Sequence, residues 1–419
     1  MSTLISRDPY RARRFETGVL PRYVSAACFI MGALALTTPS GYSFGPALLL
    51  LASPLMLWWR PSLGLDRRDA TLMVTLVGYG MLMMAMAWAD GLGSRGLDKP
   101  SRFLLAVPVA LMVLAYPPRL AWLWSGLAVG AMGAGGLAAW QKLIEGVARP
   151  GGATQAIQFG NIGLLMGMLC LAGLGWAVMQ RHRGCWVVLL LLGALGGMLA
   201  SLFSGSRGGW VGLPLMLFVL YRAYGRECPP AGSVAALGAV VLVVGLAWSL
   251  PQTGVKARVS AAVTQVGQYI AGENLHSSVG VRFEMWRGAS LLMLDKPLLG
   301  WGETGYEAGM QQLAEAGQVH PNAARFGHAH NEFFDHAAKH GLLGLAALLA
   351  LYLVPITLFA PGLRAASLSV RALATAGTLI PVGYIDFSLT QGFLAHNSGV
   401  MVYAFWVAVI WVCYRAYSD

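Results

Sequence analysis

The stretch WVVLLLLGALGGMLASLF, at residues 186–203, decides the fold class of this protein. It holds no charged residue and approaches the ~20 residues that an α-helix needs to cross a bilayer. Comparable apolar runs occur at Val24–Leu36, Phe44–Trp59, Leu72–Ala89, Leu120–Trp140, Ile162–Val178 and Val234–Leu250, and again at Leu342–Ala360, Ala372–Thr390 and Ser398–Tyr414. The sequence therefore predicts an all-α, polytopic integral membrane protein with about 12 transmembrane helices.

Composition supports this prediction over the whole length of the chain. Of its 419 residues 57% are hydrophobic and only 11% are charged, and the mean hydropathy is +0.61. Soluble domains carry about 25% charged residues, so a water-facing surface is excluded for most of the chain. We expect a single membrane domain in three parts: spans one to nine in residues 1–250, a long loop in 251–341, and spans ten to twelve in 342–419.

The net charge of +11 is explained by its distribution. Five arginines precede the first apolar run, at Arg7, Arg11, Arg13, Arg14 and Arg22. By the positive-inside rule they place the N-terminus in the cytoplasm and make a retained first helix more plausible than a cleaved signal peptide. An even number of spans then brings Arg415 and the C-terminus to the same side. The excess of basic residues therefore reflects the orientation of the helices in the membrane. We expect no nucleic acid partner.

The segment Pro251–His340 differs from the rest of the chain because it is rich in charge and holds six of the eight histidines. By the span count it is periplasmic. Apolar residues recur in it at helical spacing, which predicts short amphipathic helices on the membrane face or over the end of the bundle. The two stripes are Val259, Val263, Val266 and Ile270, and Tyr306, Met310 and Leu313. A loop of this length between spans is usually functional, so we expect the active site here.

Arginines at the outer membrane boundary are the first candidates for binding an anion. Arg207 lies among glycines in residues 204–210, and Arg282 lies in a polar helical stretch that also holds Glu284 and Arg287. A guanidinium can present two donors to a phosphate. The alternatives are a snorkelling Arg207, an Arg282–Glu284 surface pair, and an Arg287 that contacts lipid headgroups.

The histidines suggest either a metal site or a general base. His328 and His330 are two residues apart, and His336 and His340 are four apart, a spacing that could converge on zinc in a helix. However, the chain has no HExxH, no D-x-D and no cysteine in the loop. A neutral histidine that accepts a proton from a substrate is the simpler hypothesis, so we expect neither metal nor cofactor.

Asp386 is an ionisable residue near the outer end of the eleventh predicted span. Charged groups inside membranes are costly and usually face a cavity or a partner. Asp386 is therefore either a functional residue or one half of a structural ion pair.

Taken in order, three motifs resemble those of the O-antigen ligase and polymerase superfamily of bacterial envelopes. They are Ser206–Trp210, then Arg282 and Trp286 with Pro297–Gly302, and His330–Phe333 with Gly341–Gly344. The resemblance covers roughly residues 160–400.

The resemblance implies a membrane-embedded glycosyltransferase of the C type that uses polyprenyl-diphosphate-linked glycans without a metal. By motif match, Arg207 and Arg282 would contact the donor diphosphate and His330 would be the catalytic base. Asn331 follows His330 in the motif as a supporting candidate, whereas Arg287, Arg325, His328 and Asp386 are candidates from chemistry alone.

The leading interpretation is an O-antigen ligase of the bacterial inner membrane, with its active site on the periplasmic face. Its donor would be undecaprenyl-diphosphate-linked O-antigen and its acceptor lipid A–core oligosaccharide, both surrounded by membrane lipids. An O-antigen polymerase or an O-oligosaccharyltransferase of the same superfamily remains open, because the sequence does not identify the acceptor. Of the other classes, a secondary transporter or flippase lacks paired, interrupted half-helices, and a metallohydrolase lacks the ligand spacings.

The arginine asymmetry generates a topology prediction. A periplasmic reporter fused at Gly317 should be active, and the same reporter fused at the C-terminus should be inactive, because both termini are expected in the cytoplasm. A cytoplasmic reporter should give the reverse pattern at both positions. Periplasmic activity at the C-terminus would overturn the assignment.

Overall fold

A computed structural model describes residues 18–206, 208–226, 245, 249 and 255–418, and these residues contain helices and no strand. This confirms the all-α prediction. The bundle contains α2 (Val19–Ala33), α3 (Gly41–Ala52), α4 (Leu55–Trp59), α5 (Arg67–Ala89), α6 (Gly93–Ala115), α7 (Leu120–Leu143), α8 (Ala156–Ala177), α9 (Arg183–Ser204), η1 (Gly208–Trp210), α10 (Leu213–Tyr224), α15 (Glu332–Phe359), η4 (Ala360–Arg364), α16 (Leu368–Ser388) and α17 (Asn397–Ser418). A cap contains α12 (Val255–Ile270), α13 (Ser278–Asp295), α14 (Gly302–Glu315) and η3 (Ala323–Arg325).

Eight helices among the described residues are long and apolar enough to cross a membrane. They are Gly41–Trp59, Arg67–Ala89, Leu120–Leu143, Ala156–Ala177, Arg183–Ser204, Glu332–Arg364, Leu368–Ser388 and Asn397–Ser418. The first apolar helix, Val19–Ala33, has only 15 residues, and most of the predicted run Val234–Leu250 lies outside the described residues. The structure therefore supports a membrane-embedded protein, while the count of twelve spans stays a prediction.

Glycines allow α7, α8 and α9 to pack with their backbones in contact. A Cβ atom added to Gly135 of α7 would lie 2.5 Å from the carbonyl oxygen of Gly196 of α9, far inside van der Waals distance. Close approach at small residues is a main source of helix association in a bilayer, where apolar burial alone gives little. Gly135 and Gly196, each half of a glycine pair in the sequence, thus mark a helix contact.

Helices α8, α16 and α17 bury most of their length and form the centre of the bundle. Exposed tryptophans lie toward the ends of the outer helices instead, at Trp58, Trp59, Trp88, Trp122 and Trp140. Indole rings concentrate where a membrane meets water, so their placement agrees with a bundle embedded in a bilayer.

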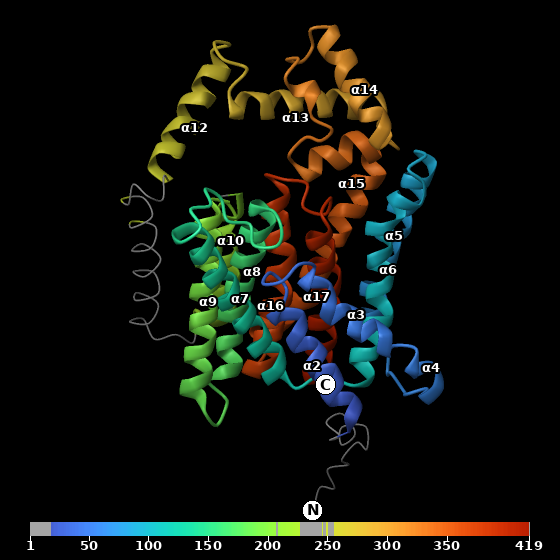
Figure 1. Ribbon diagram of the computed structural model, residues 1–419. Helices are drawn as coiled ribbons and strands as arrows, with labels where there is room; N and C mark the ends of the chain where they lie inside the picture. The colour runs from blue at the N-terminus through green and yellow to red at the C-terminus, as the bar shows by residue number, and fades with distance from the viewer. Residues whose placement is uncertain (1–17, 207, 227–244, 246–248, 250–254, 419) are drawn as a thin grey trace, which may run out of the picture.

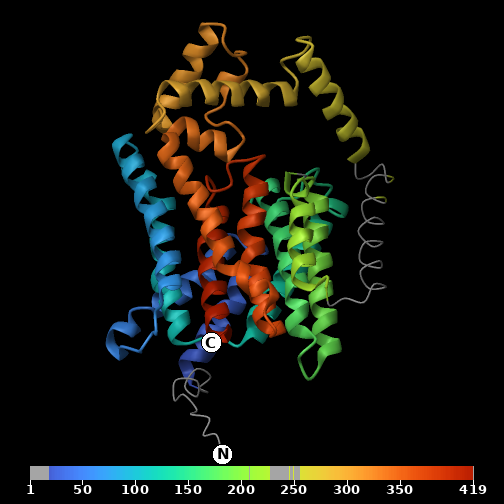
Figure 2. The same ribbon diagram turned by 180° about the vertical axis from the view of Figure 1, so that it is seen from behind.

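The cap covers one end of the bundle, and α13 runs across that end (Figure 1; Figure 2). It has a hydrophobic core of its own, which includes Met285, Leu292, Tyr306 and Met310. The predicted stripe of α14 is thus its buried face. The stripe of α12 differs, because Val263 is 68% exposed.

Backbone hydrogen bonds join the cap to the bundle. They connect the α13–α14 connection to α15. The Leu342 N–H donates to the Pro297 carbonyl oxygen at 2.7 Å, and the Trp301 N–H donates to the Ala338 carbonyl oxygen at 2.9 Å. Gly341 makes this possible, because its φ of +62° kinks α15 and a Cβ there would collide with the facing backbone. The second and third sequence motifs therefore contact each other where the cap meets the bundle.

At the end of the bundle away from the cap lie the start of α2 and the C-terminus (Figure 1). Arg415 of α17 forms ion pairs there with Asp66 at 3.0 Å and with the buried Asp69 at 3.1 Å, which anchor the start of α5. The cap and the chain end thus lie at opposite ends of the bundle. The side of the membrane that each faces stays a prediction.

Candidate functional site

His330 lies directly before α15, at the junction of cap and bundle. Its φ of +50° is in the left-handed region, which side chains other than glycine adopt only when the surroundings impose it. Asn331 imposes part of this geometry: its side-chain oxygen accepts from the Phe333 N–H at 3.0 Å and caps α15. Its Nδ2 donates to the Leu389 carbonyl oxygen at 3.2 Å. Asn331, a supporting candidate in the sequence, is thus a residue that positions His330.

Gln391, in the loop between α16 and α17, fixes the tautomer of His330. The Nδ1 atom of His330 lies 2.8 Å from Oε1 of Gln391. An amide oxygen only accepts hydrogen bonds, so Nδ1 carries the proton and Nε2 keeps a free lone pair. The Nε2 of Gln391 lies 3.4 Å from Nε2 of His396, which in turn contacts Gln155 of the α7–α8 connection at 2.9 Å.

Glu332 holds the α16–α17 loop in place. Its carboxylate is buried and accepts hydrogen bonds from the Ser388 hydroxyl at 2.7 Å and the Leu394 N–H at 2.8 Å. The Tyr352 hydroxyl and the Phe393 N–H donate to it as well, at 3.2 Å and 3.1 Å. Four donors to one carboxylate explain how a charged residue is tolerated there. The loop that carries Gln391 is thereby fixed to the residue two positions after His330.

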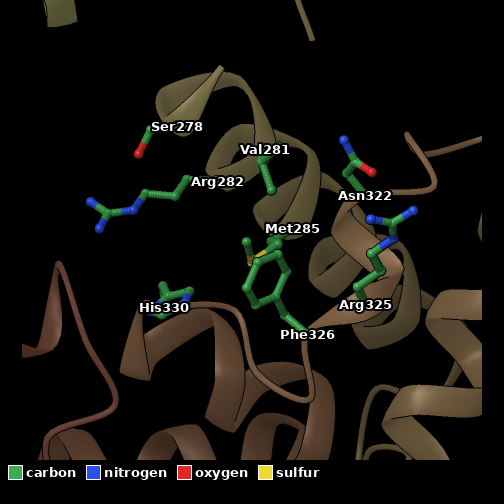
Figure 3. Close-up of a pocket in the computed structure, with 8 residues that line it drawn as sticks. All are labelled: Ser278, Val281, Arg282, Met285, Asn322, Arg325, Phe326 and His330. Atoms are coloured by element: carbon green, nitrogen blue, oxygen red, sulfur yellow. The ribbon is translucent and has the colours of Figure 1, made fainter. Parts of the chain in front are cut away.

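A cavity of about 360 Å³ lies between α13, η3 and His330, and we call it the arginine cavity. It is lined by Ser278, Val281, Arg282, Met285, Asn322, Arg325, Phe326 and His330. Arg282 extends over the His330 side, and Arg325 lies on the opposite side with Phe326 and Met285 between them (Figure 3). The structure thus brings together three residues that the sequence singled out: Arg282, Arg325 and His330.

The charge in the arginine cavity is not neutralised by the protein. Among the described residues neither Arg282 nor Arg325 has an ion pair or a hydrogen bond to its side chain. Burial lowers the pKa of Arg282, because loss of water disfavours the charged guanidinium. A half-buried guanidinium without a counterion is a site for an anion.

Arg287 lies on another side of α13. Its guanidinium is exposed and lies 3.9 Å from Glu284, a buried carboxylate that also accepts from the Tyr269 hydroxyl at 2.8 Å and the His320 N–H at 2.7 Å. The alternative in which Glu284 pairs with Arg282 is therefore wrong: Glu284 is a structural acceptor within the cap. Arg287 lines neither the arginine cavity nor the larger one described next.

A second cavity of about 1110 Å³, the wide cavity, adjoins His330 from the side of α5 and α6. Its wall includes Met83, Arg95, Lys99, Trp301, His328, Asp335, Lys339, Gln391 and His396. The ring of His328 lies 4.1 Å from that of His330, centroid to centroid. Burial lowers the pKa of His328, because loss of water disfavours the charged imidazolium. His330 itself lines the arginine cavity, and two residues that contact it, His328 and Gln391, line the wide cavity.

His336 and His340 belong to the wide cavity, yet both nitrogens of His336 are used by the protein. Its Nδ1 donates to the Glu332 carbonyl oxygen at 3.0 Å, and its Nε2 accepts from the Tyr79 hydroxyl at 3.0 Å. Within the described part of the chain no three His, Cys, Asp or Glu side chains gather as metal ligands do. His336 therefore contributes to the contact between α15 and α5.

Two sequence candidates lie elsewhere. Arg207 falls outside the described residues. Asp386 is buried near the end of α16, against Gly212 of the α9–α10 connection, and lines neither cavity. Both remain predictions.

Sequence reasoning missed Gln391, His396 and Gln155. They are isolated polar residues in connections between apolar helices and match no motif. The sequence gives one indication of their role. By the span count, the α7–α8 and α16–α17 connections lie on the same side of the membrane as the long loop.

Comparison with known proteins agrees with this geometry. Residues 192–349 match the family model described as O-antigen ligase, which confirms the resemblance seen in the motifs. The match runs from α9 into α15 and includes Arg282 and His330. A protein of Haemophilus influenzae (strain ATCC 51907 / DSM 11121 / KW20 / Rd), described as uncharacterized, is 26% identical over 375 residues, which is 88% of this chain and 92% of that protein. Over residues 192–349 the chain is thus similar to the O-antigen ligase family.

The four hydrogen bonds to Glu332 generate a prediction about stability. In Glu332→Gln an amide NH₂ replaces one acceptor oxygen and faces donors, which should cost about 1–3 kcal/mol per buried donor left unsatisfied. Thermal unfolding of the purified protein in detergent should show a clearly lowered midpoint. Glu315→Gln, the same change at an exposed position of α14, serves as the control and should unfold like the wild type. Equal midpoints for both variants would remove Glu332 as the anchor of the loop.

Proposed function

We propose that this protein is an O-antigen ligase, which transfers an O-antigen glycan from undecaprenyl diphosphate to lipid A–core oligosaccharide. The reaction would take place at the periplasmic face of the inner membrane, with an inverted anomeric configuration and without a metal or cofactor. The observation that carries the proposal is the pairing of His330, with Nε2 free to accept a proton, with the uncompensated arginines of the adjoining cavity.

The transfer requires a base and an anion-binding site on opposite sides of the reacting carbon. The acceptor hydroxyl attacks the anomeric carbon and its proton goes to Nε2 of His330. The bond from that carbon to the diphosphate oxygen breaks, and undecaprenyl diphosphate leaves with the electron pair. Arg282 stabilises the charge that grows on the diphosphate, which is where preorganised cations contribute most to catalysis. Attack from the side opposite the leaving group inverts the configuration.

The other residues have supporting roles in this proposal. Gln391 holds the proton on Nδ1 of His330, so that Nε2 is the basic atom. Arg325 adds positive charge to the far side of the arginine cavity. Arg207 is proposed as a second diphosphate contact by motif match alone.

The reaction itself is the primary test. The purified protein should join lipid-linked O-antigen to lipid A–core, at the same rate with and without a chelator. Products longer than one O-antigen unit on undecaprenyl diphosphate, formed without lipid A–core, would instead identify a polymerase. Turnover that chelator abolishes and one added metal ion restores would contradict the metal-free mechanism.

Arg282 should act on the donor. Arg282→Ala should remove most activity and weaken donor binding, and Arg282→Lys should rescue poorly, because an ammonium cannot reproduce the two parallel donors of a guanidinium. Arg287→Ala is the matched control: it lies five positions later on α13 and outside both cavities, and should leave donor affinity unchanged. Full activity in Arg282→Lys would reduce Arg282 to a packing residue.

His330 should affect the turnover rate and leave donor affinity unchanged. General-base assistance is typically worth ~10²–10⁴ in rate, so His330→Ala should lower turnover by about that range while donor affinity survives. His276→Ala, an exposed histidine of the cap, is the control. Turnover equal to the wild type in His330→Ala, or loss of donor binding, would exclude the base role.

A further inference from the structure

Two cations of α6, Arg95 and Lys99, face the wide cavity one helical turn apart. We propose that they form a second anion site, which binds a phosphate carried by the acceptor glycolipid. This inference rests on the proposed transfer to a lipid-anchored glycan and adds the group by which the acceptor is held.

The third cation of the wide cavity is already paired. The buried ammonium of Lys339 is paired with Glu303 at 2.7 Å and with Asp335 at 3.1 Å. Asp90 accepts from the hydroxyl of Thr304 at 2.6 Å and from its N–H at 2.9 Å. Among the described residues, Arg95 and Lys99 of α6 are therefore the cations of the wide cavity that carry no ion pair.

Arg95 and Lys99 differ from their neighbours on the same helix. Asp98 and Arg102 pair with each other at 2.7 Å. Among the described residues, Arg95 and Lys99 have neither an ion pair nor a side-chain hydrogen bond. Residues at i and i+4 lie on one helix face, so both can reach a single anion. A guanidinium and an ammonium together suit a phosphate monoester, which offers three oxygens.

The site adjoins the reacting residues. Lys99 and His396 line the same cavity, and burial, then the charge of Lys99, lowers the pKa of His396 to about 4. His396 contacts Gln391, which holds His330. An acceptor anchored at Arg95 and Lys99 would therefore present its sugar to Nε2 of His330.

The shape of the wide cavity suits an amphiphile. One wall is apolar and includes Leu82, Met83 and Met86 of α5, and Leu343 of α15. Helices α5 and α6 stand at the edge of the bundle beside α15 (Figure 1; Figure 2), where a lipid-anchored molecule can arrive from the bilayer. The arginine cavity has about a third of this volume. The two substrates thus have separate sites: donor diphosphate at Arg282, and acceptor phosphate at Arg95 and Lys99.

Direct binding tests the site without relying on transfer. Lipid A–core in detergent is titrated against the wild type, Arg95→Gln, Lys99→Gln and the double variant, with Arg183→Gln at the far end of α9 as control. The double variant should bind about tenfold more weakly or worse, as expected for the loss of charged hydrogen bonds. In the transfer assay its acceptor KM should rise similarly, with donor affinity unchanged.

A second binding experiment changes the ligand instead of the protein. Lipid A–core treated with phosphatase should bind the wild type as weakly as the untreated glycolipid binds the double variant, and the two losses should not add. Vesicles of phosphatidylglycerol distinguish an ordinary lipid contact. If the double variant loses only vesicle binding and keeps acceptor affinity, the cations contact headgroups and the proposal is wrong.

The experiments distinguish a failure of the phosphate site from a failure of the proposed function. If the wild type makes no joined product yet binds lipid A–core in a manner dependent on Arg95 and Lys99, the transfer reaction is wrong and the phosphate site stands. If product forms and the double variant has unchanged acceptor affinity, the phosphate site is wrong and the ligase proposal stands.

Discussion

The buried carboxylate of Glu332 is the interaction on which the site depends. A charge withdrawn from water is stable only if hydrogen bonds replace its hydration, and here they come from α15, α16 and the α16–α17 loop. Each donor has to occupy its place for the charge to be satisfied. The result is a fixed relation between the start of α15 and the loop, and hence between His330 and Gln391.

The two proposed binding regions have different origins. The arginine cavity is built mainly from the cap, whose own hydrophobic core holds α13 and α14 together. The wide cavity is built mainly from the bundle, between α5, α6 and α15. His330 lies in the few residues that connect cap to bundle: it lines the arginine cavity, and its neighbours His328 and Gln391 line the wide one. The proposed reaction of two lipid-borne substrates would need two approaches to one base, and two neighbouring cavities suit that proposal.

Local patterns in the sequence were enough to predict the helices and part of the candidate site. The apolar runs after residue 340 correspond to α15, α16 and α17, and the stripe of α14 is its buried face, because helical periodicity is a property of neighbouring residues. Arg282 and His330 share a cavity, as their common loop suggested. Gln391 could not be found this way, since its role depends on a contact across 61 positions. Glu332 was visible as a motif residue, but its anchoring role depends on residues that follow it by 20 to 62 positions.

The order of those residues along the chain has a consequence for biogenesis. Every partner of Glu332 follows it in sequence, and the last of them, Leu394, directly precedes α17. A chain still emerging from the ribosome therefore already carries Arg282 and His330, but not the loop that orients the imidazole. Domains assemble from the N-terminus as synthesis proceeds, so the reactive geometry is completed only when the final helices enter the membrane. On the proposed function, a nascent or truncated polypeptide would thus hold Arg282 and His330 without the loop that aligns the imidazole, and it would not cleave lipid-linked sugar before assembly is finished.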